Sequence, residues 1–243
     1  MKKKSQSLGV IVPCFNEEST VKQILERLFN LDFVSEIIVV DDASTDNTRK
    51  ILESIKHEKL KVLFQGVNQG KGSALRRGIC EISTDYLVIQ DADLEYHPED
   101  LEELFNVAIS READAVFGSR FLTSGSRRAV FYWHRLGNAF LTHLSNARTN
   151  IYLTDMETCY KMMRTRIAKS MDLQENRFGI EPEFTAKLAA VSNEIYEVPI
   201  RYDARTYAEG KKISWKDGVS ALRAILKYST RKQKKKMQIR IYL

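Results

Sequence analysis

Short apolar runs and segments of helical periodicity alternate five times in the first half of this 243-residue chain. Runs of four to eight apolar residues are typical of buried strands, whereas apolar residues three and four apart indicate helices. The expected strands cover residues 8–13, 35–40, 60–64, 86–90 and 115–119, and the expected helices cover residues 17–30, 49–55, 70–82 and 98–109. This alternation predicts an α/β fold with a single doubly wound, mostly parallel sheet flanked by helices.

The second half of the chain is less regular. Its expected helices cover residues 133–146, 181–191 and 215–228, its expected strand covers 194–200, its expected loops cover 122–128 and 205–212, and residues 155–161 are short and mixed. Neither an internal repeat nor a linker interrupts the pattern. We therefore expect one domain over residues 1–228, followed by a tail over residues 229–243.

The positive charge of the chain is concentrated near its end. Of the formal net charge of +6, Lys227–Leu243 supplies seven basic residues and no acidic one, which leaves −1 for the remainder. A nucleic-acid-binding fold would spread basic residues over its surface, so we do not expect nucleic acid as a partner. The tail is expected either to lie on an anionic membrane surface or to be a solvated, disordered segment.

The composition of the chain indicates the cellular compartment in which the protein is expected. The chain is 43% hydrophobic, which is enough for a buried core, and its three cysteines, Cys14, Cys80 and Cys159, are far apart and without C-x-x-C spacing. That usage is typical of a reducing cytosol rather than of a disulfide framework or a zinc site. No apolar run approaches the ~18 residues of a membrane-spanning helix. We expect a cytoplasmic protein that is soluble or peripheral on the cytoplasmic face of the membrane.

Polar clusters follow three of the expected strands. They are Asn16-Glu17-Glu18, Asp41-Asp42 and Asp91-Ala92-Asp93. In open α/β sheets the ligand crevice lies beyond the carboxyl ends of the strands, where these clusters fall. The sequence therefore predicts a ligand site at this edge of the sheet.

Asp91 and Asp93 are the candidate metal ligands within that site. Two carboxylates one residue apart can share a divalent cation, and Mg²⁺ and Mn²⁺ prefer such oxygen ligands. An acidic turn is the alternative interpretation of an isolated pair of this kind. Here an apolar strand precedes the pair and another carboxylate, Glu95, follows it, which favours a metal site.

Two further clusters suit a nucleotide. Carboxylates of Asp41-Asp42 could accept hydrogen bonds from a base or a ribose. Gly70-Lys71-Gly72 begins an expected helix, where backbone N–H groups and an ammonium group could meet a diphosphate.

Four segments together resemble the family 2 glycosyltransferases of GT-A fold. They are residues 12–17 (VPCFNE), 40–46 (VDDASTD), 68–72 (NQGKG) and 90–94 (QDADL), in the family's order. The likeness extends to about Tyr228, and the chain is most similar to the branch of dolichol-phosphate mannose synthase and polyprenyl-phosphate glycosyltransferases. It implies an inverting hexosyltransferase that moves a sugar from a UDP- or GDP-sugar to a polyprenyl (dolichyl or undecaprenyl) phosphate.

The resemblance also implies roles for individual residues. Asp91 and Asp93 would form the catalytic centre and, with Glu95, would hold Mg²⁺ or Mn²⁺ against the diphosphate. The remaining donor-side residues that would bind the nucleotide sugar are Pro13, Glu17, Asp41, Asp42, Asn68, Lys71 and Ala92.

The acceptor depends on whether the chain has a general base. A hydroxyl acceptor must lose a proton as the bond forms, whereas a phosphate is already anionic. Many family members have a catalytic Asp at the start of a late helix, and Pro182 stands at that position here. This substitution favours a phosphate acceptor, and Glu183 and Asp155 are the candidates to replace the missing base.

Arginines suited to a lipid phosphate lie in the acceptor-side segments. Guanidinium groups match phosphate geometry, and the candidates are Arg120, Arg128, Arg135 and Arg205. Solvated surface charge is the alternative interpretation of each. The mannose synthases have a Ser near an Arg in the acceptor helix, whereas His134 precedes Arg135 here. A membrane-anchoring partner protein is a further expectation.

Two other functions remain as alternatives. One keeps the donor chemistry but transfers to a saccharide hydroxyl in cell-envelope or glycan synthesis. The other is a non-catalytic binder of nucleotide sugars or anionic polymers, which the complete acidic cluster disfavours.

Overall fold

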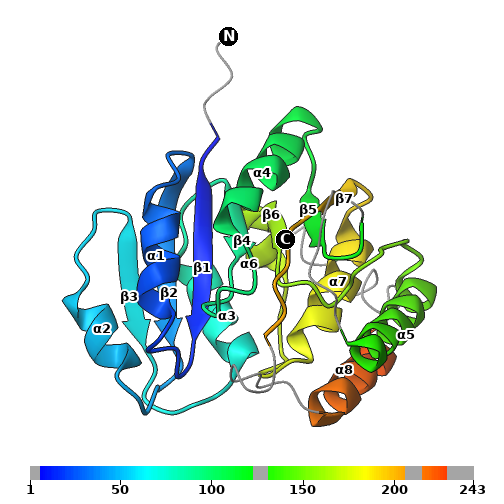
Figure 1. Cartoon of the computed structure of the whole chain (residues 1–243). Coiled ribbons are helices and arrows are strands. Elements are labelled where there is room, and N and C mark those ends of the chain that lie inside the picture. The colour runs from blue at the N-terminus through cyan, green and yellow to red at the C-terminus, as the bar shows by residue number, and fades with distance from the viewer. Residues whose placement is uncertain (1–5, 123–130, 206–214, 229–243) are drawn as a thin grey trace.

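The computed structural model describes residues 6–122, 131–205 and 215–228. Within them one seven-stranded sheet runs in the order β3-β2-β1-β4-β6-β5-β7 (Figure 1). Its strands are β1 (Leu8–Cys14), β2 (Val34–Asp41), β3 (Leu60–Phe64), β4 (Tyr86–Ile89), β5 (Ala115–Ser119), β6 (Lys161–Arg164) and β7 (Ile195–Pro199). All neighbouring strands pair in parallel except β6, which is antiparallel to β4 and β5. The predicted mostly parallel α/β sheet is confirmed.

Helices follow most of the strands. They are α1 (Val21–Phe29), α2 (Thr48–Ser54), α3 (Lys71–Glu81), α4 (Leu101–Ser110), α5 (Tyr132–Thr149), α6 (Thr165–Ser170), α7 (Ile180–Val191) and α8 (Trp215–Lys227). A 3-10 turn, Pro98–Asp100, leads into α4, because proline is well tolerated where the first N–H groups of a helix have no partner. Most of the expected loops at 122–128 and 205–212, and the whole tail at 229–243, lie outside the described residues.

The sheet core forms from the apolar runs of the central strands. Ile11 of β1 lies in register with Ile38 of β2 and Ile89 of β4, and all three side chains are fully buried. Helix α3 packs closely over β1, since a Cβ at Gly78 would stand 2.5 Å from the Ile11 side chain. This packing fixes the position of Lys71, the first residue of α3.

Two elements were not predicted. The short, mixed stretch leads into β6, and α6 follows it at once. Strand β6 offers little apolar signal, because its first residue is Lys161, whose side chain is completely buried. An antiparallel strand inserted between two strands of a parallel sheet is a long-range arrangement that local periodicity does not encode.

Helices α5, α7 and α8 lie together on one side of the molecule (Figure 1). Ala186 of α7 packs with Ala224 and Tyr228 in a small buried cluster, and the Arg148 guanidinium of α5 donates to the Leu226 carbonyl of α8 at 3.1 Å. No helix in the described part of the chain has both the length and the apolar composition to cross a membrane.

Candidate active site at the carboxyl edge of the sheet

The site lies where the strand order changes direction. Strands β1 and β4 are neighbours, but the chain continues from β1 towards β3 on one side and from β4 towards β7 on the other. A crevice opens beyond the carboxyl ends of strands at such a switch point. The loops that begin at Phe15, Asp42 and Gln90 all start at this edge, and Pro13 and Cys14 lie in register with Val40 and Asp41.

Asp42 orders the loop that leads into α3. Its carboxylate accepts hydrogen bonds from the backbone N–H groups of Gln69 (2.9 Å) and Gly70 (2.6 Å) and from the Gln65 side-chain amide (2.7 Å). The exposed Asn68 side chain donates to the Asp42 carbonyl at 3.2 Å. Asp42 thus fixes the course of this loop from a buried position.

Asp41 has a comparable role one residue earlier. Its side chain is fully buried at the end of β2 and accepts a short hydrogen bond from the Ser44 hydroxyl. The same hydroxyl accepts from the backbone N–H of Asn16 at 2.9 Å, so Asp41 joins the loops after β1 and β2.

The backbone at the start of α3 is already bonded within the protein. The N–H groups of Gly72 and Ser73 donate to the Asn176 carbonyl at 2.7 and 3.2 Å, and that of Gly70 donates to Asp42. The expectation that the N–H groups of Gly70 and Gly72 meet a diphosphate is therefore wrong. The ammonium group of Lys71 is the part of this segment that faces the acidic cluster.

Four charges of alternating sign run inward, from the partly exposed Asp91 and Lys71 to the buried Glu181 and Lys161. The Lys71 ammonium lies 2.8 Å from Asp91 Oδ1 and 3.0 Å from Glu181 Oε1, and Glu181 Oε2 lies 2.5 Å from the Lys161 ammonium. Burial opposes the charge of Lys71, but Asp91 and Glu181 outweigh it and hold the pKa of Lys71 well above its ordinary value. Lys71 therefore stays charged beside Asp91, linked through Glu181 to the core.

Asp93 lies close to two other negatively charged side chains. Burial, and then the charges of Asp91 and Glu95, raise the pKa of Asp93 to about 7. The Glu95 carboxylate accepts from the Tyr202 hydroxyl at 2.6 Å and from the backbone N–H of Arg205 at 2.8 Å. Its contacts therefore hold the segment around Arg205 against the loop that follows β4.

Arg205 contacts both the loop that follows β1 and the loop that follows β4. Its guanidinium donates to the Asp93 carbonyl, with Nε at 2.9 Å, and lies 3.2 Å from Glu17 Oε2. A bridge between Tyr96 and Tyr202 brings this segment to the site. Arg205, predicted to bind the acceptor, thus lies beside the predicted metal ligand Asp93 and beside Glu17.

The chemistry of Asp91 and Asp93 suits a divalent cation. A carboxylate whose pKa is raised by its anionic neighbours becomes more stable when a cation joins the cluster. Two carboxylates leave further coordination positions for phosphate oxygens and water, as Mg²⁺ and Mn²⁺ require. Within the described ranges, no three His, Cys, Asp or Glu side chains are arranged to enclose a metal by themselves.

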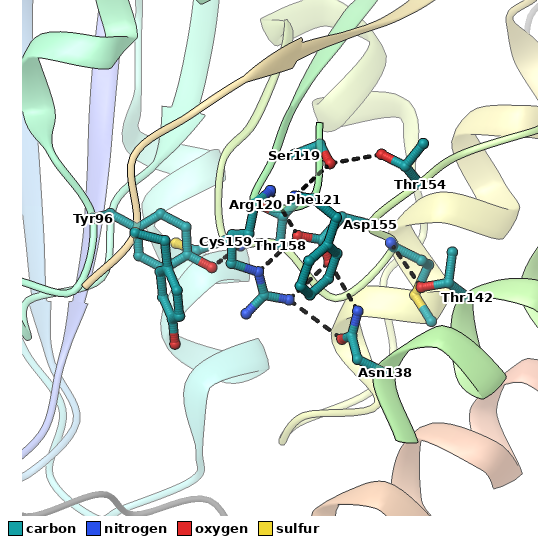
Figure 2. A network of polar contacts seen from close by, with 12 residues as sticks. Tyr96, Ser119, Arg120, Phe121, Asn138, Thr142, Thr154, Asp155, Thr158 and Cys159 are labelled. Atoms are coloured by element: carbon teal, nitrogen blue, oxygen red, sulfur yellow. Dashed lines mark hydrogen bonds and ion pairs between the residues drawn. The ribbon is translucent and has the colours of Figure 1, made fainter. Parts of the chain in front are cut away.

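A second ion pair joins Arg120, which directly follows β5, to the buried Asp155 (Figure 2). Arg120 binds Asp155 through both ends, with Nε at 2.7 Å from Oδ2 and Nη2 at 2.8 Å from Oδ1. Asn138 of α5 donates to Asp155 at 3.2 Å and accepts from Arg120 at 3.3 Å. Burial acts to raise the pKa of Asp155, but Arg120 outweighs it and the net pKa is lowered. These contacts give Asp155 the geometry of a partner that positions Arg120.

The remaining acceptor arginines are more dispersed. The Arg135 guanidinium stacks over the Phe121 ring at 3.9 Å, while the ring of Tyr202 lies 5.0 Å from the Arg120 guanidinium. Arg128 lies outside the described residues. The structure therefore brings Arg120 and Arg135 to the same region, through Phe121.

Glu183 has a full set of partners in the fold. Its Oε1 lies 2.9 Å from the Gln174 N–H and 2.6 Å from the Lys187 ammonium, and its Oε2 accepts from the Glu175 N–H at 2.8 Å. These contacts fix the loop that packs against the start of α3. Pro182 lies in the first turn of α7, where a proline is tolerated.

Sequence reasoning missed three charged residues of the site: Lys161, Glu181 and Glu157. Burial, and then the charge of Glu181, raise the pKa of Glu157 to about 7. Its Oε1 atom is buried and makes no hydrogen bond among the described residues. The stretch that contains Glu157 and Lys161 is mixed in polarity and gave no clear signal, and the meeting of these residues with α7 depends on the placement of β6.

The fold is a mostly parallel α/β sheet flanked by helices, as in solved structures of the GT-A class. A crystal structure of glucosyl-3-phosphoglycerate synthase from Mycobacterium tuberculosis superposes with a TM-score of 0.69 at 19% identity, over 91% of this chain and 79% of that chain. The same synthase in complex with Mn²⁺, UDP-glucose and phosphoglyceric acid gives a TM-score of 0.69 at 19% identity, over 90% of this chain and 80% of that chain. At this identity the likeness establishes the fold.

Sequence comparison identifies the family. Glycosyl transferase family 2 matches residues 9–171, and the chain belongs to this family. The undecaprenyl-phosphate mannosyltransferase of Micrococcus luteus is 30% identical over 83% of this chain and 85% of its own length. The dolichol-phosphate mannosyltransferase of Pyrococcus furiosus is 28% identical over 84% of this chain and 58% of its own length. The resemblance to the polyprenyl-phosphate branch is thus confirmed.

Proposed function

We propose that this glycosyltransferase is an inverting hexosyltransferase that uses a UDP- or GDP-sugar and transfers the sugar to a polyprenyl phosphate. The observation that carries the proposal is the pairing of two unlike groups of charges at the carboxyl edge of one sheet. One group has the carboxylates of Asp91 and Asp93 beside Lys71, and the other has the guanidinium of Arg120 beside Asp155. A metal-bound diphosphate suits the first group, and an anionic acceptor suits the second.

The donor side accounts for the leaving group. Asp91 and Asp93 would hold Mg²⁺ or Mn²⁺, which supplies Lewis-acid stabilisation of the departing nucleoside diphosphate when bound. Lys71 and Arg205 flank these carboxylates and would balance phosphate charge from the protein side. Pro13, Glu17 and the loop ordered by Asp42 would enclose the nucleotide. Solved structures of the GT-A synthase with Mn²⁺ and UDP support this assignment.

The acceptor side accounts for the nucleophile. An oxygen of the lipid phosphate would attack the anomeric carbon while the bond from that carbon to the diphosphate oxygen breaks, which inverts the configuration. No proton has to be removed, because the phosphate is already ionised. The engagement of Asp155 and Glu183 in ion pairs supports a reaction without a base. The names of the Micrococcus and Pyrococcus relatives support the lipid phosphate.

Glu157 supports a second candidate function. A carboxyl group whose pKa is about 7 and whose Oε1 has no hydrogen-bond partner in the described structure has the properties of a general base. The alternative is therefore transfer of the same sugar to a saccharide hydroxyl, with Glu157 accepting the proton.

The direct test is a transfer assay with purified protein and Mg²⁺ or Mn²⁺. A panel of UDP- and GDP-hexoses is offered with undecaprenyl phosphate, and labelled lipid is extracted and quantified. We expect metal-dependent transfer with at least one donor, and loss of the product with EDTA. Undecaprenol, which lacks the phosphate, is the matched control. Equal transfer to undecaprenol, or product only with saccharide acceptors, would contradict the proposal.

Substitutions separate the two candidates. Asp93→Asn should abolish transfer under either function, because it removes a metal ligand. Glu157→Gln should change the rate of transfer to a phosphate acceptor by less than about threefold. The same change should cost about 10²–10⁴-fold if Glu157 is the general base.

A further inference from the structure

The loop at residues 171–179, which joins α6 to α7, covers the start of α3. The Asn176 carbonyl of this covering loop accepts hydrogen bonds from the backbone N–H groups of Gly72 and Ser73, at 2.7 and 3.2 Å. The first N–H groups of a helix have no partner within the helix. The covering loop supplies that partner, so the start of α3 is bonded to a segment about a hundred residues later in the chain.

Glu175 links the covering loop to two helices. Its carbonyl accepts from the Arg76 guanidinium of α3 at 2.8 Å. Its carboxylate points the other way: Oε1 accepts from the Lys227 ammonium at 2.7 Å and from the Tyr228 hydroxyl at 3.1 Å. Oε2 lies 3.6 Å from the guanidinium of Arg223, which, like Lys227, belongs to α8. One buried residue therefore joins α8 to the start of α3.

Lys71 lies between two glycines that both touch the covering loop. A Cβ at Gly70 would stand 2.6 Å from the Asn176 carbonyl oxygen. A Cβ at Gly72 would stand 2.1 Å from the Glu175 carbonyl oxygen. Only glycine allows a backbone to approach this closely. Because the loop touches the backbone on both sides of Lys71, a shift of the loop would shift Lys71 as well.

Two carboxylates hold the covering loop, and they act on different parts of it. Glu183 of α7 accepts from the backbone N–H groups of Gln174 and Glu175, and it also pairs with Lys187 of the same helix at 2.6 Å. Those contacts do not involve the Glu175 side chain. The loop should therefore stay folded when the Glu175 carboxylate is removed, and lose its contact with α8.

We propose that Glu175 is a positioning residue, which α8 holds and which in turn keeps the Lys71 ammonium beside Asp91. Figure 1 shows α8 beside α7 and apart from α3, so α8 acts on Lys71 through the covering loop. The proposal rests on the proposed function for the role of Lys71, which is to meet the diphosphate of the donor. A binding group that is misplaced by about 1 Å can cost about 10²-fold in rate. The helix α8 thus contributes to the affinity for a nucleoside diphosphate.

Calorimetric titration of the full chain with UDP and with GDP, each with Mn²⁺, tests the proposal. For whichever nucleotide binds, Glu175→Ala should weaken binding about tenfold, since a hydrogen bond to a charged group contributes about that factor or more. Glu175→Gln keeps an oxygen for Lys227 and Tyr228 and should stay within about threefold of the wild type. Glu81→Ala is the matched control, because it removes an ion pair with Lys61 (2.6 Å) at the opposite end of α3. Its affinity should equal that of the wild type.

A double-variant cycle separates positioning from general stability. In a Lys71→Met background, Glu175→Ala should weaken nucleotide binding by less than about twofold, because the group that Glu175 positions has been removed. An equal loss in both backgrounds would overturn the proposal. In steady-state transfer, Glu175→Ala should raise the KM for the nucleotide sugar and leave the KM for undecaprenyl phosphate unchanged. An equal rise of both KM values would also contradict positioning of Lys71.

A crystal structure of nucleotide-free Glu175→Ala measures the position of Lys71 directly, whether or not the proposed function holds. We expect the distance from the Lys71 ammonium to Asp91 Oδ1 to exceed hydrogen-bond range. An unchanged distance of 2.8 Å would overturn the proposal. Failure of the wild type to bind either nucleotide would contradict the proposed function alone.

Discussion

Asp155 and Arg120 show how a single buried contact can be assigned a role. The Asp155 side chain is fully buried, and its two oxygens each meet the Arg120 guanidinium. A buried ion pair contributes little net stability, but removing one partner leaves an uncompensated charge. The pair is therefore suited to fixing the guanidinium in one orientation at the edge of the crevice.

Asp155→Ala should lower the free energy of unfolding by about 3–5 kcal/mol, because Arg120 would stay buried without its partner. Urea denaturation at pH 7 measures this free energy. The double variant Arg120→Met/Asp155→Leu should lose less of it, because no unpaired charge stays buried. The lowered pKa of Asp155 sets the pH dependence. The stabilisation that ionised Asp155 provides should be present above about pH 4, the ordinary pKa of an Asp side chain. It should be lost as the pH falls below that value. A stable Asp155→Ala variant with a large loss of kcat would instead indicate a general base.

Glu157→Gln tests the opposite case, a carboxyl group whose pKa is raised. In the folded protein the pKa of Glu157 is about 7, above the ordinary value of 4.5. Between these two pH values the folded state therefore binds a proton that the unfolded state has released. The free energy of unfolding accordingly falls as the pH rises from 4.5 to 7. The variant should match the wild type near pH 4 and be more stable at pH 8. A shift of this size corresponds to on the order of 3 kcal/mol. Thermal unfolding across this range measures the difference, and a constant difference would contradict the raised pKa.

At the scale of elements, the start of α3 shows where sequence reasoning succeeds and where it stops. The periodicity and the glycines predicted a helix over 70–82, and the helix spans Lys71–Glu81. The sequence also indicated Lys71 as a site residue. It could not show that Glu175 and Asn176, about a hundred residues later, cover the helix N-terminus. That contact depends on tertiary packing, which local pattern does not encode.

The same limit applies to the buried charges. Asp91, Asp93 and Asp42 were predictable because strand ends in a parallel sheet converge on one edge. Lys161 and Glu181 were not, since their meeting requires the antiparallel β6 to place a lysine beneath α7. Hydrophobic periodicity reports the faces of an element, and it gives no information on which distant element a buried charge meets.

Gly72→Ala should show how tightly the loop of Glu175 and Asn176 packs against the start of α3. A Cβ at this position would stand 2.1 Å from the Glu175 carbonyl oxygen, so the backbone of the covering loop must move. We expect a loss of about 1–3 kcal/mol in the free energy of unfolding. Gly137→Ala on α5 is the control, since its Cβ would meet nothing within 4 Å. It should be neutral or stabilising by up to about 1 kcal/mol. Equal changes in the free energy of unfolding for the two variants would show that the loop moves without cost, which would contradict the prediction.

At the scale of the whole molecule, the crevice joins two unequal parts of one sheet. Strands β3, β2 and β1 lead into the loops proposed to bind the nucleotide, while β4, β6, β5 and β7 lead into the acidic loop and the segments proposed to bind the acceptor. Arg205 contacts residues from both parts, and Lys71, which follows β3 in the first part, contacts Asp91 in the second. A ligand that occupies the crevice therefore contacts both parts, and its binding should stabilise the whole domain.

Thermal unfolding with nucleotides is the corresponding prediction. A ligand at ~100 times its Kd adds about 2.7 kcal/mol, which for a domain of this size raises Tm by roughly 5–10 °C. We expect this shift with Mn²⁺ and either UDP or GDP together, and little with Mn²⁺ and CMP; the effective nucleotide would identify the donor class. In Asp93→Asn the shift should shrink to its value in EDTA. Its ligand-free Tm at pH 8 should equal or exceed that of the wild type, since burial and like charges disfavour the ionised Asp93. A nucleotide shift that is the same in EDTA, or unaltered in Asp93→Asn, would contradict the metal site.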